Sequence, residues 1–357
     1  MDDYGGLLRT LKHWALVDCL RKFKLIITSR PEDHIIQTFP ESISTHINIP
    51  SGSNVKPGDS TSNDIQLFLM SRLSAMGMDE VWVNEAHDYL VPWAAGMFIW
   101  ATTAADFLSV NPETRFDSLK RDDTEGLDNL HSLYLTVVTA SFGRALKREI
   151  KAITSVIGAT IFAKRPLDDT MLLRLPGVEN LQMLKFIKND LMSVIDSSST
   201  LRFHHRSFED FLLSPSFQED LPKFSGIRNR SLHERQLAVL CLNTMVSSEL
   251  HFNMCNLNTS SITNQSILTT AKSAISSLIS YSSQFWADYL VQTQREEALI
   301  KAVKFIMHEK LLFWIEAMSI LGKAHEVSAI LKRALEWPGL AVCPEFVSYI
   351  TTLRLAG

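Results

Sequence analysis

The sequence predicts a mainly α-helical protein that begins with a short α/β segment. Three observations carry this prediction. Apolar residues recur at helical spacing over most of the 357 residues. One apolar, β-branched run, residues 25–28, stands between two helical patterns near the start. Later segments are helical runs separated by loops rich in Ser, Asn and Gly, with no repeat of fixed period.

The first segment, residues 1–50, reads as helix, strand and helix start. Leu7, Leu11 and Trp14 recur at helical spacing before the strand at 25–28. Ser29 with Glu32 three residues later forms a capping-box pattern at the start of the next helix. A second short strand is expected at 46–50. A single buried strand leaves its ladder groups unpaired, so we expect this segment to pair with something outside the chain or to be poorly ordered.

The remaining chain divides into a loop and three helical parts. Residues 51–63 are rich in Ser, Gly, Asn and Pro and predict a linker, after which Asp64 is expected to cap a helix. Residues 64–126 predict a small helical domain that ends in a charged connector at 112–125. In residues 127–217, three amphipathic helices and a two-strand hairpin, 193–195 with 201–204, suggest a winged helix, after which Ser207 caps a further helix. Residues 218–357 predict a helical array.

Composition excludes several classes of protein. The formal net charge of -4 gives no field that would attract nucleic acid or an acidic membrane surface. The four cysteines form no C-x-x-C pair, which argues against a zinc site or a disulfide framework and favours a reducing compartment. A secretory signal is absent, and no apolar stretch reaches the ~20 residues that a membrane helix needs. We therefore expect a cytoplasmic protein with no metal site, no nucleic-acid partner and no membrane span.

Arg30 is the sharpest candidate for a ligand site. It follows the 25–28 strand directly, and in open α/β sheets ligands bind beyond the carboxyl ends of the strands. Its planar, permanently charged guanidinium suits phosphate. The phosphate-cradling pattern G-x-x-x-x-G-K-[ST] occurs nowhere in the chain, and the one Gly-Lys pair, Gly322 with Lys323, is followed by Ala324. Without the resemblance described next, a surface arginine after a strand would be the favoured interpretation.

Several segments resemble the nucleotide-binding core of fungal NACHT-type signal-transduction ATPases, which often carry WD repeats. The resembling segments occur in the family's order: KLIITSRPE (24–32), INIPSGSNVKPGD (47–59), AAGMFIWATTAADF (94–107), LRFHHRSFEDFLL (201–213) and YSSQFWADYL (281–290). The resemblance implies that KLIITSRPE is the sensor-one strand of an ATPase sheet and that FHHRSFEDFL lies in a winged helix. It also implies that Asp2 and Asp3 are similar to the tail of the Walker B segment.

Two nucleotide-sensing residues follow from this resemblance. Arg30 corresponds to a sensor of the γ-phosphate, and His205, beside His204, corresponds to the winged-helix histidine that faces the ADP β-phosphate. In intact relatives ATP or ADP and Mg²⁺ occupy such a site. Walker A, most of Walker B and the WD repeats are missing here, so we expect a truncated family member with a vestigial site and no cofactor. No catalytic residue is expected, because no Ser/His/Asp or Cys/His constellation is present.

Three functions remain open. The leading hypothesis is a signalling or scaffold protein related to nucleotide-gated assembly in fungal innate recognition, without ATPase activity. The alternative is an α-helical interaction module that docks onto full-length NACHT relatives through its unpaired strand and helical surface. The third, an intact enzyme that uses other residues, is disfavoured by the missing constellation.

Overall fold

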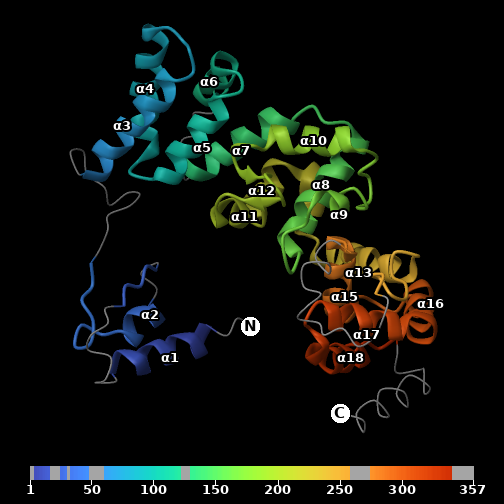
Figure 1. Cartoon of the computed structure of the whole chain (residues 1–357). Helices are drawn as coiled ribbons and strands as arrows, with labels where there is room; N and C mark the ends of the chain where they lie inside the picture. Colours follow the sequence, from blue (N-terminus) through green and yellow to red (C-terminus); the bar gives the residue numbers. More distant parts are fainter. Residues whose placement is uncertain are drawn as a thin grey trace.

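The computed structural model of the chain describes residues 4–16, 25–29, 33–47, 60–121, 129–257 and 274–339. These residues are mainly helical, as the sequence predicts. Figure 1 shows a chain of helical groups in which the first two helices lie apart from the others. One antiparallel pair of strands, β1 (Ile195–Asp196) and β2 (Arg202–Phe203), is present in the described part of the chain. The predicted hairpin between 193 and 204 is therefore confirmed, whereas the winged helix stays a prediction.

The helices and their bounds follow in chain order. They are α1 (Tyr4–Leu16), α2 (Asp33–Thr38), α3 (Ser60–Ser74), α4 (Glu80–Ala94), α5 (Phe98–Leu108), α6 (Pro112–Arg121), α7 (Asn129–Phe142), α8 (Lys147–Phe162), α9 (Asp169–Leu172), α10 (Leu181–Asp190), α11 (Arg206–Leu212), α12 (Pro215–Asp220), the 3-10 helix η3 (Pro222–Arg228), α13 (Arg230–Val246), α15 (Ser277–Leu290), α16 (Glu297–Phe305), the π-helix η4 (Ile306–Lys310), α17 (Leu311–Ile320), the 3-10 helix η5 (Ala324–Glu326) and α18 (Val327–Leu335).

Side-chain caps start many of these helices. A side chain in the N-cap position accepts a hydrogen bond from a backbone N–H of the first turn, which would otherwise have no partner. The residues that do so are Asp79 before α4, Asp168 before α9, Asn180 before α10, His205 before α11, Ser214 before α12, Asn229 before α13 and Ser276 before α15. Local sequence therefore decides where these helices begin.

The expected strand at residues 25–28 is wrong. Residues 25–29 have no secondary structure and are exposed, and Ile26 exposes 87% of its surface. A strand exists only when a neighbouring strand satisfies its backbone N–H and C=O groups, and no described segment lies alongside to do so. His46 and Ile47, the described part of the second expected strand, are likewise outside any strand. The described part of the expected α/β remnant thus consists of two helices, α1 and α2, and residues without secondary structure.

Two further expectations are corrected by packing. Residues 112–121 form a helix, α6, and not a charged connector, because Phe116 and Leu119 lie three residues apart and bury themselves against the neighbouring helices. Helix α3 begins at Ser60, four residues before the expected cap at Asp64. Its first turn is polar, and its buried stripe begins at Ile65.

The helical groups from α3 to α18 share one continuous core. Helix α5 lies at the centre of the first group, contacting α3, α4, α6 and α7. In the last group α13 and α15 pack along each other, and α15 buries Tyr281, Trp286 and Tyr289 among other side chains. Trp314 of α17 packs edge to face on Trp286 at 5.9 Å and donates its indole N–H to the Ser283 carbonyl. These aromatic residues belong to the core.

His233 joins the middle group to the last group. Its ring is fully buried on α13, stacks on Phe162 of α8 at 5.7 Å, and bonds through Nε2 to the Gly226 carbonyl of η3 at 2.9 Å. Gly158 of α8 leaves the space that this ring fills, since a Cβ at residue 158 would lie 2.1 Å from His233 Cε1 and Nε2. Burial lowers the pKa of His233, because the charged imidazolium loses hydration inside the core.

Gly158→Ala is expected to destabilise the protein, although alanine is ordinarily the better helix former. The new methyl group would overlap the His233 ring, which Phe162 and Gly226 hold in place, and overpacking of this kind costs about 1–3 kcal/mol. Urea unfolding of Gly158→Ala, of His233→Ala and of the double variant measures the effect. In the His233→Ala background the Gly158→Ala change should become neutral or stabilising. Equal costs in the two backgrounds would show that the ring is not the obstacle.

Protonation of His233 should lower the free energy of unfolding as the pH falls. Its pKa is lower in the folded chain than the ~6.5 of an exposed histidine, so below about pH 6.5 the unfolded chain binds the proton more readily. This contribution is complete above about pH 6.5 and is lost as the pH falls toward the folded-state pKa. Urea unfolding between pH 8 and pH 5 should give a steeper loss for the native chain than for His233→Gln. Parallel pH curves would contradict the assignment.

Candidate functional site

His205 lies at the end of the hairpin and opens helix α11. It occupies the N-cap position in extended backbone conformation, and its Nδ1 accepts a hydrogen bond from the Ser207 backbone N–H at 3.1 Å. The imidazole is exposed. The sequence analysis expected Ser207 to provide this cap. The structure instead places Ser207 inside the first turn, because its hydroxyl is engaged by a residue from another helix.

That residue is Tyr134 of α7. The Ser207 hydroxyl lies 2.7 Å from Tyr134 Oη and 2.7 Å from His205 Nδ1. Since Nδ1 already accepts the Ser207 N–H, its lone pair also takes the Ser207 hydroxyl proton, which leaves the Ser207 oxygen to accept from the Tyr134 hydroxyl. Tyr134 also shares a side-chain hydrogen bond with Thr103, which is buried on α5. The four side chains form a chain of hydrogen bonds from α5 through α7 to α11.

An aromatic cluster surrounds this hydrogen-bonded chain. Tyr134 packs on Phe208 at 5.0 Å and on Phe211 at 5.5 Å, and Phe217 of α12 meets Phe211 at 5.0 Å. Burial raises the pKa of Tyr134, and the hydrogen bonds with Ser207 and Thr103 oppose that effect. The phenol therefore stays neutral and acts as a donor. The segment FHHRSFEDFL thus places Phe208 and Phe211 in the core and leaves both of its histidines exposed.

The chemistry open to His205 and Ser207 is limited. A nucleophilic serine needs a base whose far side is oriented by a third group. His205 Nδ1, the nitrogen nearest Ser207, is engaged as a helix cap, and the described residues provide no acidic partner for its Nε2. Helix capping and the link between helices are the roles that this geometry supports. The His204 Nε2 lies 3.2 Å from the Met192 carbonyl oxygen, so His204 is not part of the hydrogen-bonded chain through Ser207.

Arg30, the second predicted sensing residue, lies outside the described residues, as do Asp2 and Asp3. The described segments on either side of Arg30 are residues 25–29 and α2. Figure 1 shows α2 apart from α11, which carries His205 at its start. The sensing roles of Arg30 and His205 therefore stay predictions.

A cavity of about 20 Å³ lies where α4, α5, α6 and α7 meet. This volume holds one water molecule. Its walls are mainly aromatic and polar, and include Tyr89, Trp93, Trp100, Asn129 and Thr136. The Asn129 side-chain amide donates to the Trp93 carbonyl at 2.9 Å, and the Trp100 indole N–H donates to the Asn129 carbonyl at 3.0 Å. The cavity is too small for a nucleotide, and Trp100 is part of the core.

The described ranges contain no group of three or more His, Cys, Asp or Glu side chains arranged to hold a metal ion. Cys241 is fully buried, and burial raises its thiol pKa to about 12, so it is not a reactive thiolate. No helix within the described ranges has both the length and the apolar character needed to cross a bilayer.

Comparisons of the chain with models of protein families, with curated proteins and with solved structures found no match. The resemblance to NACHT-type ATPases rests on the sequence segments alone. Among the described site residues, Tyr134 and Thr103 escaped the sequence analysis. They lie 73 and 104 positions before Ser207, and each belongs to an apolar helix in which a hydroxyl gives no sign of its partner.

The hydrogen bond between Tyr134 and Ser207 should be measurable as a coupling. Tyr134→Phe and Ser207→Ala each leave one buried or half-buried hydroxyl without its partner, so each is expected to cost about 1–3 kcal/mol of unfolding free energy. In a double-mutant cycle the second substitution should cost less than the first, with a coupling of about 0.5–1.5 kcal/mol. Thr160→Ala, which removes a local bond within α8, serves as an uncoupled control. Strict additivity for Tyr134 and Ser207 would contradict the proposed bond.

Proposed function

We propose that this chain is a signalling scaffold that works by binding another protein, without hydrolysing ATP. The observation that carries the proposal is the exposure of apolar side chains in the described residues between 4 and 47. Of these only Phe39 is buried. The large apolar side chains left exposed are Leu7, Trp14, Leu16, Leu25, Ile26, Ile27, Ile36 and Ile47. Exposed apolar side chains concentrated in one segment are typical of a protein-interaction site.

The backbone of this segment favours a particular mode of binding. Residues 25–29 are exposed and without secondary structure, residues 26–28 are β-branched, and the segment lies between two helices, α1 and α2, that contact each other. An extended segment can add to the edge of a partner's sheet, where main-chain hydrogen bonds supply affinity and alternate side chains supply specificity. The flanking helices would then cover one face of the enlarged sheet with the apolar side of α1. A partner with an open sheet edge fits these requirements.

The resemblance to NACHT-type ATPases narrows the class of partner. KLIITSRPE is similar to a strand of the family's ATPase sheet, so the sheet that this segment matches best is the ATPase domain of a full-length relative. The helices from α3 to α18 share one core and supply the folded body of the scaffold. Regulation of nucleotide-gated assembly in a NACHT signalling system is the function that this combination supports.

The sequence lacks the pattern of a phosphate-binding loop, and this supports the proposal that the chain does not hydrolyse ATP. A phosphate loop needs glycines and a lysine immediately before a helix whose N-terminal N–H groups face the phosphates. The one Gly-Lys pair, at Gly322, instead ends α17 with a left-handed conformation (φ 72°), and a single 3-10 turn, η5, follows. That arrangement presents no cradle.

Binding to a purified NACHT ATPase domain with intact Walker motifs tests the proposal. Ile26→Lys combined with Ile27→Lys should weaken binding at least about ten-fold, because two charges would enter an apolar contact. Leu67→Lys with Leu312→Lys, at exposed apolar positions on α3 and α17, is the matched control and should bind as the native chain does. Equal affinity for all three chains, or no binding by the native chain, would reject the proposal.

A parallel titration with a fluorescent ATP analogue and Mg²⁺ tests the catalytic part. The native chain is expected to show no hydrolysis and no saturable high-affinity binding. Hydrolysis that is lost in Arg30→Ala or His205→Ala would show instead that the chain is a working ATPase.

A further inference from the structure

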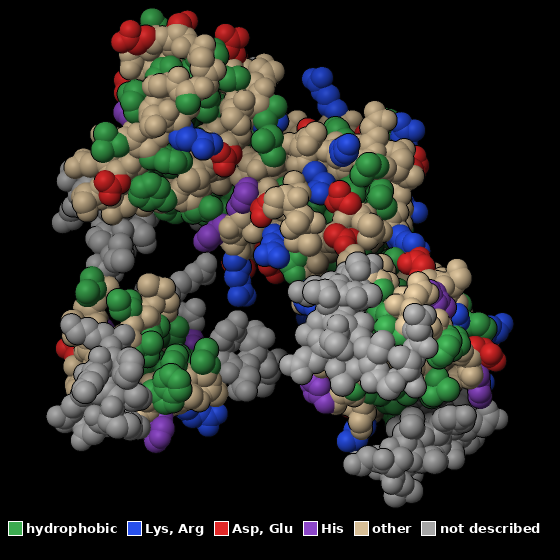
Figure 2. All heavy atoms as spheres, in the orientation of Figure 1, with side chains coloured by type: hydrophobic (Ala, Val, Ile, Leu, Met, Phe, Trp, Pro, Cys, Tyr) green, Lys and Arg blue, Asp and Glu red, His purple; other side chains and the backbone are tan. Residues whose placement is uncertain are grey.

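Charge is distributed unevenly along the folded chain. Residues 60–121 carry eight Asp and Glu against four Lys and Arg, whereas residues 129–229 carry thirteen Lys and Arg against ten Asp and Glu. The first group therefore has a formal charge of -4 and the second of +3. Figure 2 shows acidic side chains gathered over the outer end of the α4 and α6 part and Lys and Arg side chains around the α8 and α10 part.

The acidic end has a small projecting centre, which we call the acidic tip and define as residues 78–81 in the turn from α3 into α4. Asp79 caps α4 and Glu80 follows it in the first turn, and both are exposed. Glu80 forms no ion pair within the described residues. Beside these acids Val81 exposes 77% of its surface. The tip thus presents two negative charges next to an uncovered apolar side chain.

The basic face is centred on the start of α8. The basic patch comprises Arg144, Lys147, Arg148, Lys151 and Lys185, all of them exposed and without a carboxylate partner in the described part of the chain. The acid among them, Glu149, is engaged by the Leu146 backbone N–H at 2.8 Å. Positive charge in the first turn of a helix is unfavourable within the chain itself, because it faces the positive end of the helix dipole. An external anionic group would relieve that repulsion.

The basic patch also borders an uncovered apolar side chain. Phe186 of α10 exposes 40% of its surface and packs edge to face on Phe142 at 6.0 Å. Phe142 ends α7, two residues before Arg144, and Lys185 precedes Phe186 on α10. Lys223 donates to the Phe142 and Gly143 carbonyls at 2.9 and 2.7 Å, which holds this corner in place. The patch and the tip therefore have the same kind of composition, with charged side chains beside exposed apolar ones, and their charges are opposite.

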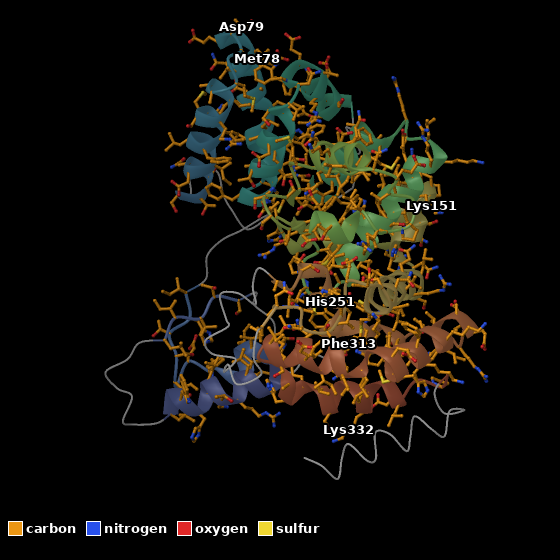
Figure 3. All side chains as sticks on the ribbon, turned by 45° about the vertical axis from the view of Figure 1, so that its right-hand side comes forward. Met78, Asp79, Lys151, His251, Phe313 and Lys332 are labelled. Atoms are coloured by element: carbon orange, nitrogen blue, oxygen red, sulfur yellow. The ribbon has the colours of Figure 1, made fainter. Side chains whose placement is uncertain are left out.

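The tip and the patch of one chain are far apart. Figure 3 labels Met78 and Asp79 at the tip and Lys151 on α8 on another side of the molecule, and Figure 1 separates the same elements in a second view. We propose that the acidic tip of one copy docks on the basic patch of a second copy, with Val81 against Phe186. Because the two surfaces differ, the contact is head to tail and each added copy leaves one tip and one patch free. Such a contact produces open chains or closed rings.

A second copy fits the patch better than a nucleic acid does. The whole chain carries a net charge of -4, so a long polyanion approaching the patch would also meet the acidic group of helices. The tip offers the patch a compact pair of charges and an apolar side chain at once. Contacts between exposed charges are screened by salt, so the self-association should depend on ionic strength, unlike an apolar contact through residues 25–29.

Sedimentation velocity of the full chain tests the proposal. The native chain is expected to form concentration-dependent assemblies at about 50 mM salt and to dissociate at least about ten-fold more readily at about 500 mM. Arg144→Glu, Lys147→Glu and Arg148→Glu together reverse the patch, whose net charge including Glu149 changes from +4 to -2. Glu80→Lys with Val81→Lys reverses the tip while keeping the Asp79 cap. Each variant alone should be monomeric, because its tip and patch then carry the same sign.

An equimolar mixture of the two variants should assemble again, since each tip then meets a patch of opposite sign on the other variant. Lys301→Glu, Lys304→Glu and Lys332→Glu on α16 and α18 make the same change in net charge as the patch variant, at exposed positions outside the patch, and this control should assemble as the native chain does. Circular dichroism checks that every variant is folded. A native chain that stays monomeric at low salt, or a mixture that does not reassemble, overturns the proposal. Binding of single-stranded DNA that is lost only in the patch variant would assign the patch to a nucleic acid instead.

Discussion

The burial of His233 against Gly158 is the constraint on which the connection between the helical groups depends. The imidazole fills a space that exists only because residue 158 has no Cβ, and its Nε2 satisfies the Gly226 carbonyl. One side chain on α13 therefore sets the distance to α8 and to η3 together. At the other end of the same interface, the Tyr281 and Tyr289 hydroxyls both receive the Lys164 backbone N–H just after α8. Buried polar groups with complete partners hold such a junction in one arrangement.

The hydrogen-bonded chain through Tyr134 and Ser207 also fixes how helices pack, at the opposite face of the middle group. It links α5, α7 and α11 through side chains, and the aromatic cluster around Phe208 packs against Tyr134. His205 ends this chain at the surface as a helix cap. A residue in this position is mechanically connected to the first helical group, so a ligand that displaced His205 would act on helices beyond its own. The geometry therefore gives the histidine a structural role whether or not nucleotide binds.

The segment before α3, in contrast, leaves its apolar side chains exposed. Its apolar side chains are those of a β-strand and two amphipathic helices, and folding within the described chain buries almost none of them. The acidic tip and the basic patch likewise have no ion-pair partner within the described part of one copy. The core is complete while two surfaces are left without partners, which is the condition expected of a protein that works in an assembly.

Local sequence determined most helices and the hairpin of this protein. Periodic apolar residues predicted α1, α7, α8 and α10, and the hairpin expected between residues 193 and 204 is the pair β1–β2, because such signals act over a few residues. Tertiary structure decided the rest. Residues 25–28 have strand composition but lack the neighbouring strand that would satisfy their backbone, and α6 is a helix because Phe116 and Leu119 meet the core. His205, rather than Ser207, became the cap because Tyr134, 73 positions earlier, takes the Ser207 hydroxyl. Partners so distant in sequence meet only when the chain folds, and no local pattern encodes them.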